Sequence, residues 1–270
     1  MRDRRTVWLE EAVIAFRAAL QELTHERCRV TNPYWSSEER PAVPSVMNAL
    51  GSRRGTVTLL VLDFMAHCEQ VLKIESASAT DNPLVFAKTN EVISGGNFHG
   101  APLAMAFDYA AIAVTDLMNI CERRIDRLTN PDKSEGLPAF LARKPGVESG
   151  FMVAQVAAAA LVNEARVLAH PASSDNVTTS GGKEDHVSMG MTAALKLRSI
   201  VDLAENILAI ELLAAAEALE HRHPLKAGKG VERAFKLVRQ IAPKLTKDRP
   251  LSNDIAQVAE QIRSGKFVKL

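Results

Sequence analysis

Residues 186–220 read HVSMGMTAALKLRSIVDLAENILAIELLAAAEALE, a long stretch without proline. Its one glycine, Gly190, lies close to its start. The apolar residues do not share a single helical stripe; they include Val187, Met191, Leu195, Ile200, Leu203, Ile207, Ile210 and Leu213. A helix that is apolar on nearly every face is a buried helix. At roughly 1.5 Å per residue it would exceed about 50 Å, so we expect it to pack against copies of itself or against a partner chain.

The rest of the chain adds further helical segments on both sides of this stretch. Helices are predicted over residues 7–23, 56–75, 102–128, 151–170, 229–243 and 251–264. Proline and glycine predict a loop with a short helical piece at residues 29–55 and a loop at residues 129–150. Only short strands are expected, at residues 84–86 and 92–93. The predicted fold class is therefore all-α, a bundle of long helices.

The composition agrees with a helical protein. Apolar residues make up 47% of the chain and aromatic residues only 5%, a balance that favours helix over sheet. Lys and Arg (33) nearly cancel Asp and Glu (32), so no charge pattern indicates binding to nucleic acid or to an anionic membrane. The N-terminus is not typical of a secretory signal, and no apolar run reaches the ~18 residues of a membrane span. We expect a soluble, cytoplasmic protein.

The chain has three cysteines, Cys28, Cys68 and Cys121. Their number is odd and their spacing is not that of metal ligands. We expect them to be small, buried apolar residues in a reducing compartment. The sequence predicts no metal site.

Three short polar motifs have a structural interpretation when each is taken alone. Asp81-Asn-Pro83 is a turn signal. Ser94-Gly-Gly96 also indicates a turn, because glycine permits positive φ and a close approach of the backbone to another group. Glu184 and Asp185 suit the start of the long helix that follows them. His186 in isolation is more often a hydrogen-bonded structural histidine than a catalytic one.

Taken together, these motifs resemble the histidine ammonia-lyase (aromatic amino acid lyase) family in order and spacing. The matching segments are Thr80-Asp-Asn-Pro-Leu84, Ser94-Gly-Gly-Asn-Phe-His99 and Lys183-Glu-Asp-His-Val-Ser-Met189. The similarity is to the C-terminal half of the family. It implies a long-helix bundle like the C-terminal part of the ammonia-lyase fold. Residues 1–55 would be a divergent N-terminal helix and loop, and residues 56–270 an ammonia-lyase-like helical domain.

The resemblance also implies roles for particular residues. Asn82 matches the asparagine near the prosthetic group, and Phe98 matches the phenylalanine that packs on the substrate side chain. Glu184 matches the glutamate typical of the histidine branch and is the candidate catalytic and substrate-binding carboxylate. This choice makes chemical sense, since a carboxylate can accept a hydrogen bond from an imidazole N–H. Supporting roles are expected for three neighbours of these residues, namely Asn97, His99 and His186.

The sequence departs from the family in the groups that drive its chemistry. Such enzymes use an electrophile, methylidene-imidazolone, cyclised from Ala-Ser-Gly, and these 270 residues contain no Ala-Ser-Gly. Thr179-Ser-Gly181 imitates it only superficially, in the loop before Glu184. The family's Tyr and Arg, which bind the prosthetic group and the substrate carboxylate, have no secure match. Asn32-Pro-Tyr34 is only weakly similar to their motif. Lys183 replaces the usual glutamine, and the family's catalytic tyrosine has no counterpart here.

Without an electrophile, a carboxylate cannot remove the scarcely acidic β-proton of an amino acid. Two hypotheses follow. In the favoured one, the chain is the C-terminal subunit of a split lyase of histidine metabolism, acting on histidine or a related aromatic amino acid. An N-terminal-half lyase subunit would supply methylidene-imidazolone within a homo- or hetero-oligomer resembling the family's tetramer, and the chain alone would be inactive. In the alternative, it is a non-catalytic helical scaffold or binding protein.

Overall fold

A computed structural model describes residues 52–224 and 227–269 of the chain. The helix predicted for residues 7–23 and most of the loop predicted for residues 29–55 lie outside these ranges. The described elements are, in order, α3 Ser52–Ala77, β1 Leu84–Phe86, β2 Glu91–Ile93, α4 Ala101–Thr129, η2 Ala139–Leu141, α5 Met152–Leu168, η3 Ser180–Gly182, α6 Gly190–Glu220, α7 Lys229–Ile241, α8 Ser252–Arg263 and η4 Lys266–Lys269. Here η denotes a short 3-10 helix. The predicted all-α class is confirmed.

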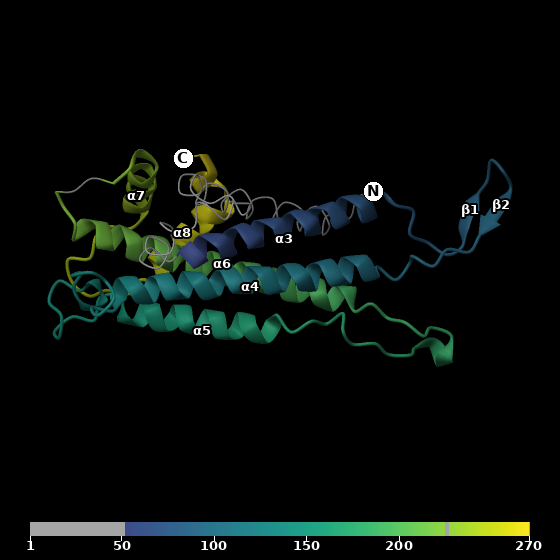
Figure 1. The fold of residues 1–270 in the computed structure, drawn as a ribbon, viewed down its shortest axis with the longest axis horizontal. Coiled ribbons are helices and arrows are strands. Elements are labelled where there is room, and N and C mark those ends of the chain that lie inside the picture. The colour runs from purple at the N-terminus through teal and green to yellow at the C-terminus, as the bar shows by residue number, and fades with distance from the viewer. Residues whose placement is uncertain (1–51, 225–226, 270) are drawn as a thin grey trace, which may run out of the picture.

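The four long helices α3, α4, α5 and α6 run alongside one another and make the molecule elongated (Figure 1). α4 packs against α3, α5 and α6, and α6 also contacts α7 and α8. The core lies along α4 and α6, whose largest fully buried side chains are Leu117, Met118, Ile125, Leu197, Ile200, Ile207, Ile210 and Glu217. From Ile200 to its end, every residue of α6 is buried or half-buried. The prediction of a buried helix is confirmed for this part of α6.

The start of α6 differs from the prediction. The helix begins at Gly190, preceded by Met189 with φ 56°, so residues 186–189 are not helical. Left-handed backbone at a methionine interrupts the helical path. At about 1.5 Å per residue, α6 is therefore roughly 46 Å long. Glu184 and Asp185 are not helix-start residues, because the loop still runs for several residues beyond them.

The predicted strand segments form a two-stranded antiparallel hairpin. Leu84 pairs with Ile93 and Phe86 with Glu91. The hairpin projects beyond the end of the helix bundle (Figure 1). The chain reverses at residues 87–90, whereas Ser94-Gly-Gly96 is an irregular segment after β2. At Gly95, a Cβ would lie 3.1 Å from the Asp81 carbonyl oxygen, so the expected close approach of glycine backbone occurs there.

In the described part of the chain, α4 is the one helix long and apolar enough to cross a membrane by length and composition. The most apolar window of this helix is 61% buried inside the protein. Core helices of soluble proteins have the same properties. The position of α4 between three other helices explains its composition without a membrane.

Both described cysteines are buried, as the sequence predicted. The thiol of Cys68 donates to the Ala106 carbonyl oxygen at 3.2 Å, and burial raises its pKa to about 11. Burial also raises the pKa of the Cys121 thiol well above its usual value. Cys28 lies outside the described residues.

These thiols should be inert in the folded protein, because the thiolate is the reactive species and it is disfavoured at both sites. In a Cys28→Ser variant at pH 8, we expect no reaction with a chromogenic disulfide reagent over minutes, and rapid reaction of two thiols in denaturant. The absorbance of the released thiolate measures both. Rapid reaction of either thiol without denaturant would contradict the described packing.

Candidate functional site

Two loops meet at the end of the bundle that carries the hairpin (Figure 1). One loop ends at Gly100 and leads into α4; the other, residues 169–189, leads into α6. Because α4 and α6 pack together, their first turns bring the ends of these loops side by side. Ser188 Oγ donates to the His99 carbonyl oxygen at 2.5 Å. Gly190 lies close to Ala104, and an added Cβ would be 3.6 Å from the Ala104 Cβ.

This meeting point gathers four of the residues predicted from the sequence. The rings of Phe98 and His99 lie 4.1 Å apart between centroids. His99 also faces His186 edge to face at 5.2 Å. His99 Nε2 is 3.8 Å from the Glu184 carboxylate oxygen Oε2. The structure therefore places an aromatic ring, two imidazoles and one carboxylate in a single cluster.

The cluster is open on one side in this chain. Phe98 is 38% exposed, and the side chains of His99 and Glu184 are 23% and 41% exposed. An enclosed ligand pocket would bury such groups much further. The four residues thus form a partly exposed cluster and not an enclosed pocket.

Asn82 lies apart from this cluster, next to the hairpin. Its side-chain oxygen Oδ1 accepts hydrogen bonds from Ser94 Oγ at 3.1 Å and from the Gly95 N–H at 3.2 Å. No hydrogen bond or ring contact within the described ranges joins Asn82 to Phe98, His99 or Glu184. The two donors fix the carboxamide with its NH2 group directed away from them. Asn82 can therefore donate to an oxygen of a bound group.

Asn97 turns towards α3 and away from the cluster. Its Nδ2 lies 3.4 and 3.5 Å from the two carboxylate oxygens of Glu75, which are long contacts. Glu75 was not predicted as a site residue, since it lies in a helical pattern without a motif. A supporting role for Asn97 stays a prediction, now with Glu75 as its partner.

Around Glu184, the loop is held by backbone hydrogen bonds and by the Asn176 side chain. The Thr179 N–H donates to the Glu184 carbonyl oxygen at 2.9 Å. Asn176 donates to the Asp185 carbonyl oxygen at 3.1 Å and accepts from the Val187 N–H at 2.9 Å. Thr179-Ser-Gly181 lies in this exposed loop. Within the described ranges no group of three His, Cys, Asp or Glu side chains could hold a metal ion.

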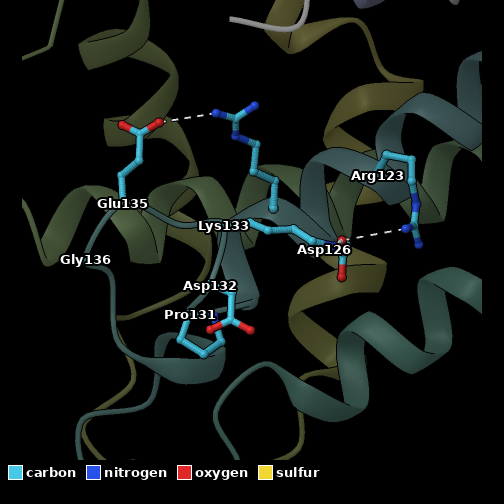
Figure 2. A pocket seen from close by; sticks show the side chains of 8 residues that line it. Arg123, Asp126, Pro131, Asp132, Lys133, Glu135 and Gly136 are labelled. Carbon is cyan, nitrogen blue, oxygen red and sulfur yellow. Dashed lines mark hydrogen bonds and ion pairs between the residues drawn. The ribbon is translucent and has the colours of Figure 1, made fainter. Parts of the chain in front are cut away.

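A cavity of about 610 Å³ lies at the opposite end of α4 (Figure 2). It is lined by Arg123, Asp126, Arg127, Pro131, Asp132, Lys133, Glu135 and Gly136. Its charges largely pair with one another: Lys133 Nζ is 2.8 Å from Asp126 Oδ2, and Arg127 Nη2 is 3.2 Å from Glu135 Oε1. None of the predicted site residues lines this cavity. It is separate from the cluster at the start of α4.

Comparison with known proteins gives a consistent result. Residues 56–240 match the family described as aromatic amino acid lyase. Histidine ammonia-lyase from Stigmatella aurantiaca is 54% identical over 204 residues, which cover 76% of this chain and 40% of the relative. Histidine ammonia-lyase from Koribacter versatilis is 53% identical over 219 residues, covering 77% and 42%. The chain thus spans less than half the length of these curated relatives.

Solved structures show the same relationship. The crystal structure of histidine ammonia-lyase from Trypanosoma cruzi superposes with a TM-score of 0.79 at 38% identity, covering 98% of this chain and 56% of that chain. A tyrosine aminomutase from Streptomyces globisporus superposes with a TM-score of 0.78 at 30% identity, covering 98% and 59%. The fold described above is therefore the fold of part of these longer chains.

Proposed function

Because this chain belongs to the aromatic amino acid lyase family, we propose that it is the C-terminal, substrate-pocket subunit of a split histidine ammonia-lyase-like enzyme. The reaction would eliminate ammonia from histidine or a related aromatic amino acid. One observation carries this proposal: Phe98, His99 and Glu184 meet at the start of α4 and α6 and form a wall that is open on one side. A second polypeptide would complete the site.

The wall offers two complementary contacts to an imidazole ring. The Glu184 carboxylate can accept a hydrogen bond from a ring N–H, and an ionised acceptor makes that bond stronger. The Phe98 ring can pack on the face of the imidazole. His99 lies beside Glu184, with Nε2 3.8 Å from Oε2, and would line the site next to the carboxylate. Together these groups would bind and orient the substrate and hold a proton at the Glu184 carboxylate.

The prosthetic group expected for the family is methylidene-imidazolone, which supplies the electrophile that makes departure of ammonia feasible. Asn82 fits such a group, because its carboxamide is oriented through Oδ1 and its NH2 can donate to a carbonyl oxygen. The 270 residues contain no Ala-Ser-Gly. We propose that a partner chain, an N-terminal-half lyase subunit, supplies the electrophile.

Exposed apolar residues close to the site support assembly with other chains. Met105 and Ile112 of α4 are 61% and 46% exposed, and Met191 and Leu195 of α6 are 64% and 55% exposed. They lie in the parts of both helices nearest the cluster. Apolar surface of this kind at the edge of an open site favours a homo- or hetero-oligomer.

The proposal is tested by co-expressing the chain with a lyase-like partner that contains Ala-Ser-Gly, purifying the complex and adding histidine. We expect urocanate to form, seen as rising near-ultraviolet absorbance, and ammonia to be released. The matched control carries alanine for the serine of the partner's Ala-Ser-Gly and should form no product. Ammonia release by the purified chain alone, or an inactive but well-assembled complex, would contradict the proposal.

The alternative function is a non-catalytic scaffold or binding protein. Lys183 in place of glutamine favours it, as does the absence of a secure match to the family's Tyr and Arg. A stable symmetric oligomer of this chain that binds no imidazole ligand would support this alternative.

A further inference from the structure

The loop between α5 and α6 must place Glu184 accurately although it has little regular structure of its own. It runs from residue 169 to residue 189, and η3 is its one short helix. The Glu184 side chain is 41% exposed, and its Oε2 lies 3.8 Å from His99 Nε2, beyond hydrogen-bond distance. The neighbours of the side chain therefore do not fix it. Its position depends on what holds the backbone of the loop.

A buried carboxylate of α4 and a half-buried lysine of α6 anchor the first part of the loop. Asp108 of α4 is 3% exposed, and its Oδ2 accepts the Ser173 N–H at 2.7 Å. Its Oδ1 lies 3.8 Å from Lys196 Nζ of α6, and Lys196 in turn donates to the His170 carbonyl oxygen. The hydrogen bonds to Ser173 and His170 therefore tie the loop to both α4 and α6.

Asn176 holds the last part of the loop. Its carboxamide donates to the Asp185 carbonyl oxygen and accepts from the Val187 N–H. These two backbone groups belong to the residues on either side of His186, and the first of them, Asp185, directly follows Glu184. An asparagine that uses both its donor and its acceptor in this way replaces the pairing that a neighbouring strand would supply.

We infer that Asn176, on the anchor made by Asp108 and Lys196, is a positioning residue for Glu184. It holds the backbone at residues 184–187 so that the carboxylate lies beside His99. This inference rests on the proposed function, because it assigns Glu184 the recognition of substrate. A displacement of about 1 Å in a reacting or binding group can cost a hundredfold in rate, so the clamp would set the efficiency of the site.

Hydrogen–deuterium exchange of the full chain tests the clamp directly. In Asn176→Ala, we expect the backbone amides of residues 184–188 to exchange about tenfold faster or more, because two hydrogen bonds that resist local opening are lost. Amides within α4 and α6 should keep their protection. The matched control is Asn163→Ala, an exposed asparagine of α5, which should leave the loop unchanged. Equal exchange in Asn176→Ala and the wild type would overturn the inference.

A double-mutant cycle in the assembled complex tests the link to Glu184. Asn176→Ala should lower kcat/KM for histidine about tenfold or more, and have no further effect in a Glu184→Ala background, because coupled residues are not additive. Equal effects in both backgrounds would show that Asn176 does not act through Glu184. If the wild-type complex is inactive, the proposed function fails, and the exchange experiment still decides whether Asn176 holds the loop.

Discussion

Replacing Glu184 with alanine is expected to lower the kcat/KM of the assembled enzyme for histidine by about 10²–10⁴-fold, the usual contribution of a positioned acid–base group. Within the described cluster Glu184 is the one carboxylate; its Oε2 lies 3.8 Å from His99 Nε2, and the His99 ring packs against Phe98. In the proposed function this carboxylate binds the imidazole of the substrate. Steady-state formation of urocanate by the purified complex measures the change, and the mass of the complex shows that assembly is unaffected.

Two further variants sharpen this experiment. Glu184→Gln keeps the shape of the side chain and removes its charge. We therefore expect kcat/KM to fall more for histidine than for phenylalanine or tyrosine, whose rings offer no N–H. Asp175→Ala removes an exposed carboxylate from the same loop and should change kcat/KM by less than about threefold. Unchanged activity of Glu184→Ala would mean that the carboxylate has no part in substrate recognition or catalysis.

The helices were predictable from the sequence because their pattern is local. A long apolar run without proline gives α6, a second one that begins at Pro102 gives α4, and short apolar segments flanked by turn residues give the hairpin. Helix ends were less predictable. Nothing in residues 186–189 indicates that Met189 adopts positive φ, since helix propensity alone would continue the helix to His186. The packing of Ser188 against His99 sets that boundary, and it is a tertiary contact.

The candidate site also has a part that was predictable from local motifs and a part that depends on tertiary contacts. Phe98, His99, Glu184 and His186 were identified from motifs, and the structure brings them together. The motifs did not indicate that Asn82 is oriented by Ser94 and Gly95, or that Asn97 lies towards Glu75. The residues that hold the loop, Asp108, Lys196 and Asn176, were also missed. They are distant in sequence, and an isolated Asp, Lys or Asn carries no local signal of a tertiary contact.

The second large effect expected is on stability and concerns a buried carboxylate of α6. Glu217 is 2% exposed, and its Oε2 lies 2.8 Å from Arg239 Nη2 of α7. The Leu245 N–H donates to the same oxygen at 3.3 Å. Arg239→Leu leaves this charge buried without its cation, and breaking such a pair costs about 3–5 kcal/mol. We expect the free energy of unfolding to fall by that amount, measured by equilibrium denaturation in urea.

The pair itself need not be the source of this stability. If the cost in Arg239→Leu comes from an uncompensated charge, removing the charge should reverse most of it. The double variant Glu217→Gln/Arg239→Leu should therefore be more stable than Arg239→Leu alone, because a neutral amide is cheaper to bury than a carboxylate. Arg233→Leu, at an exposed position of the same helix, should change stability by no more than about 0.5 kcal/mol. A double variant as unstable as Arg239→Leu would show that the arginine acts through its other contacts, to Glu220 and the Ala242 carbonyl oxygen, and not through the charge of Glu217.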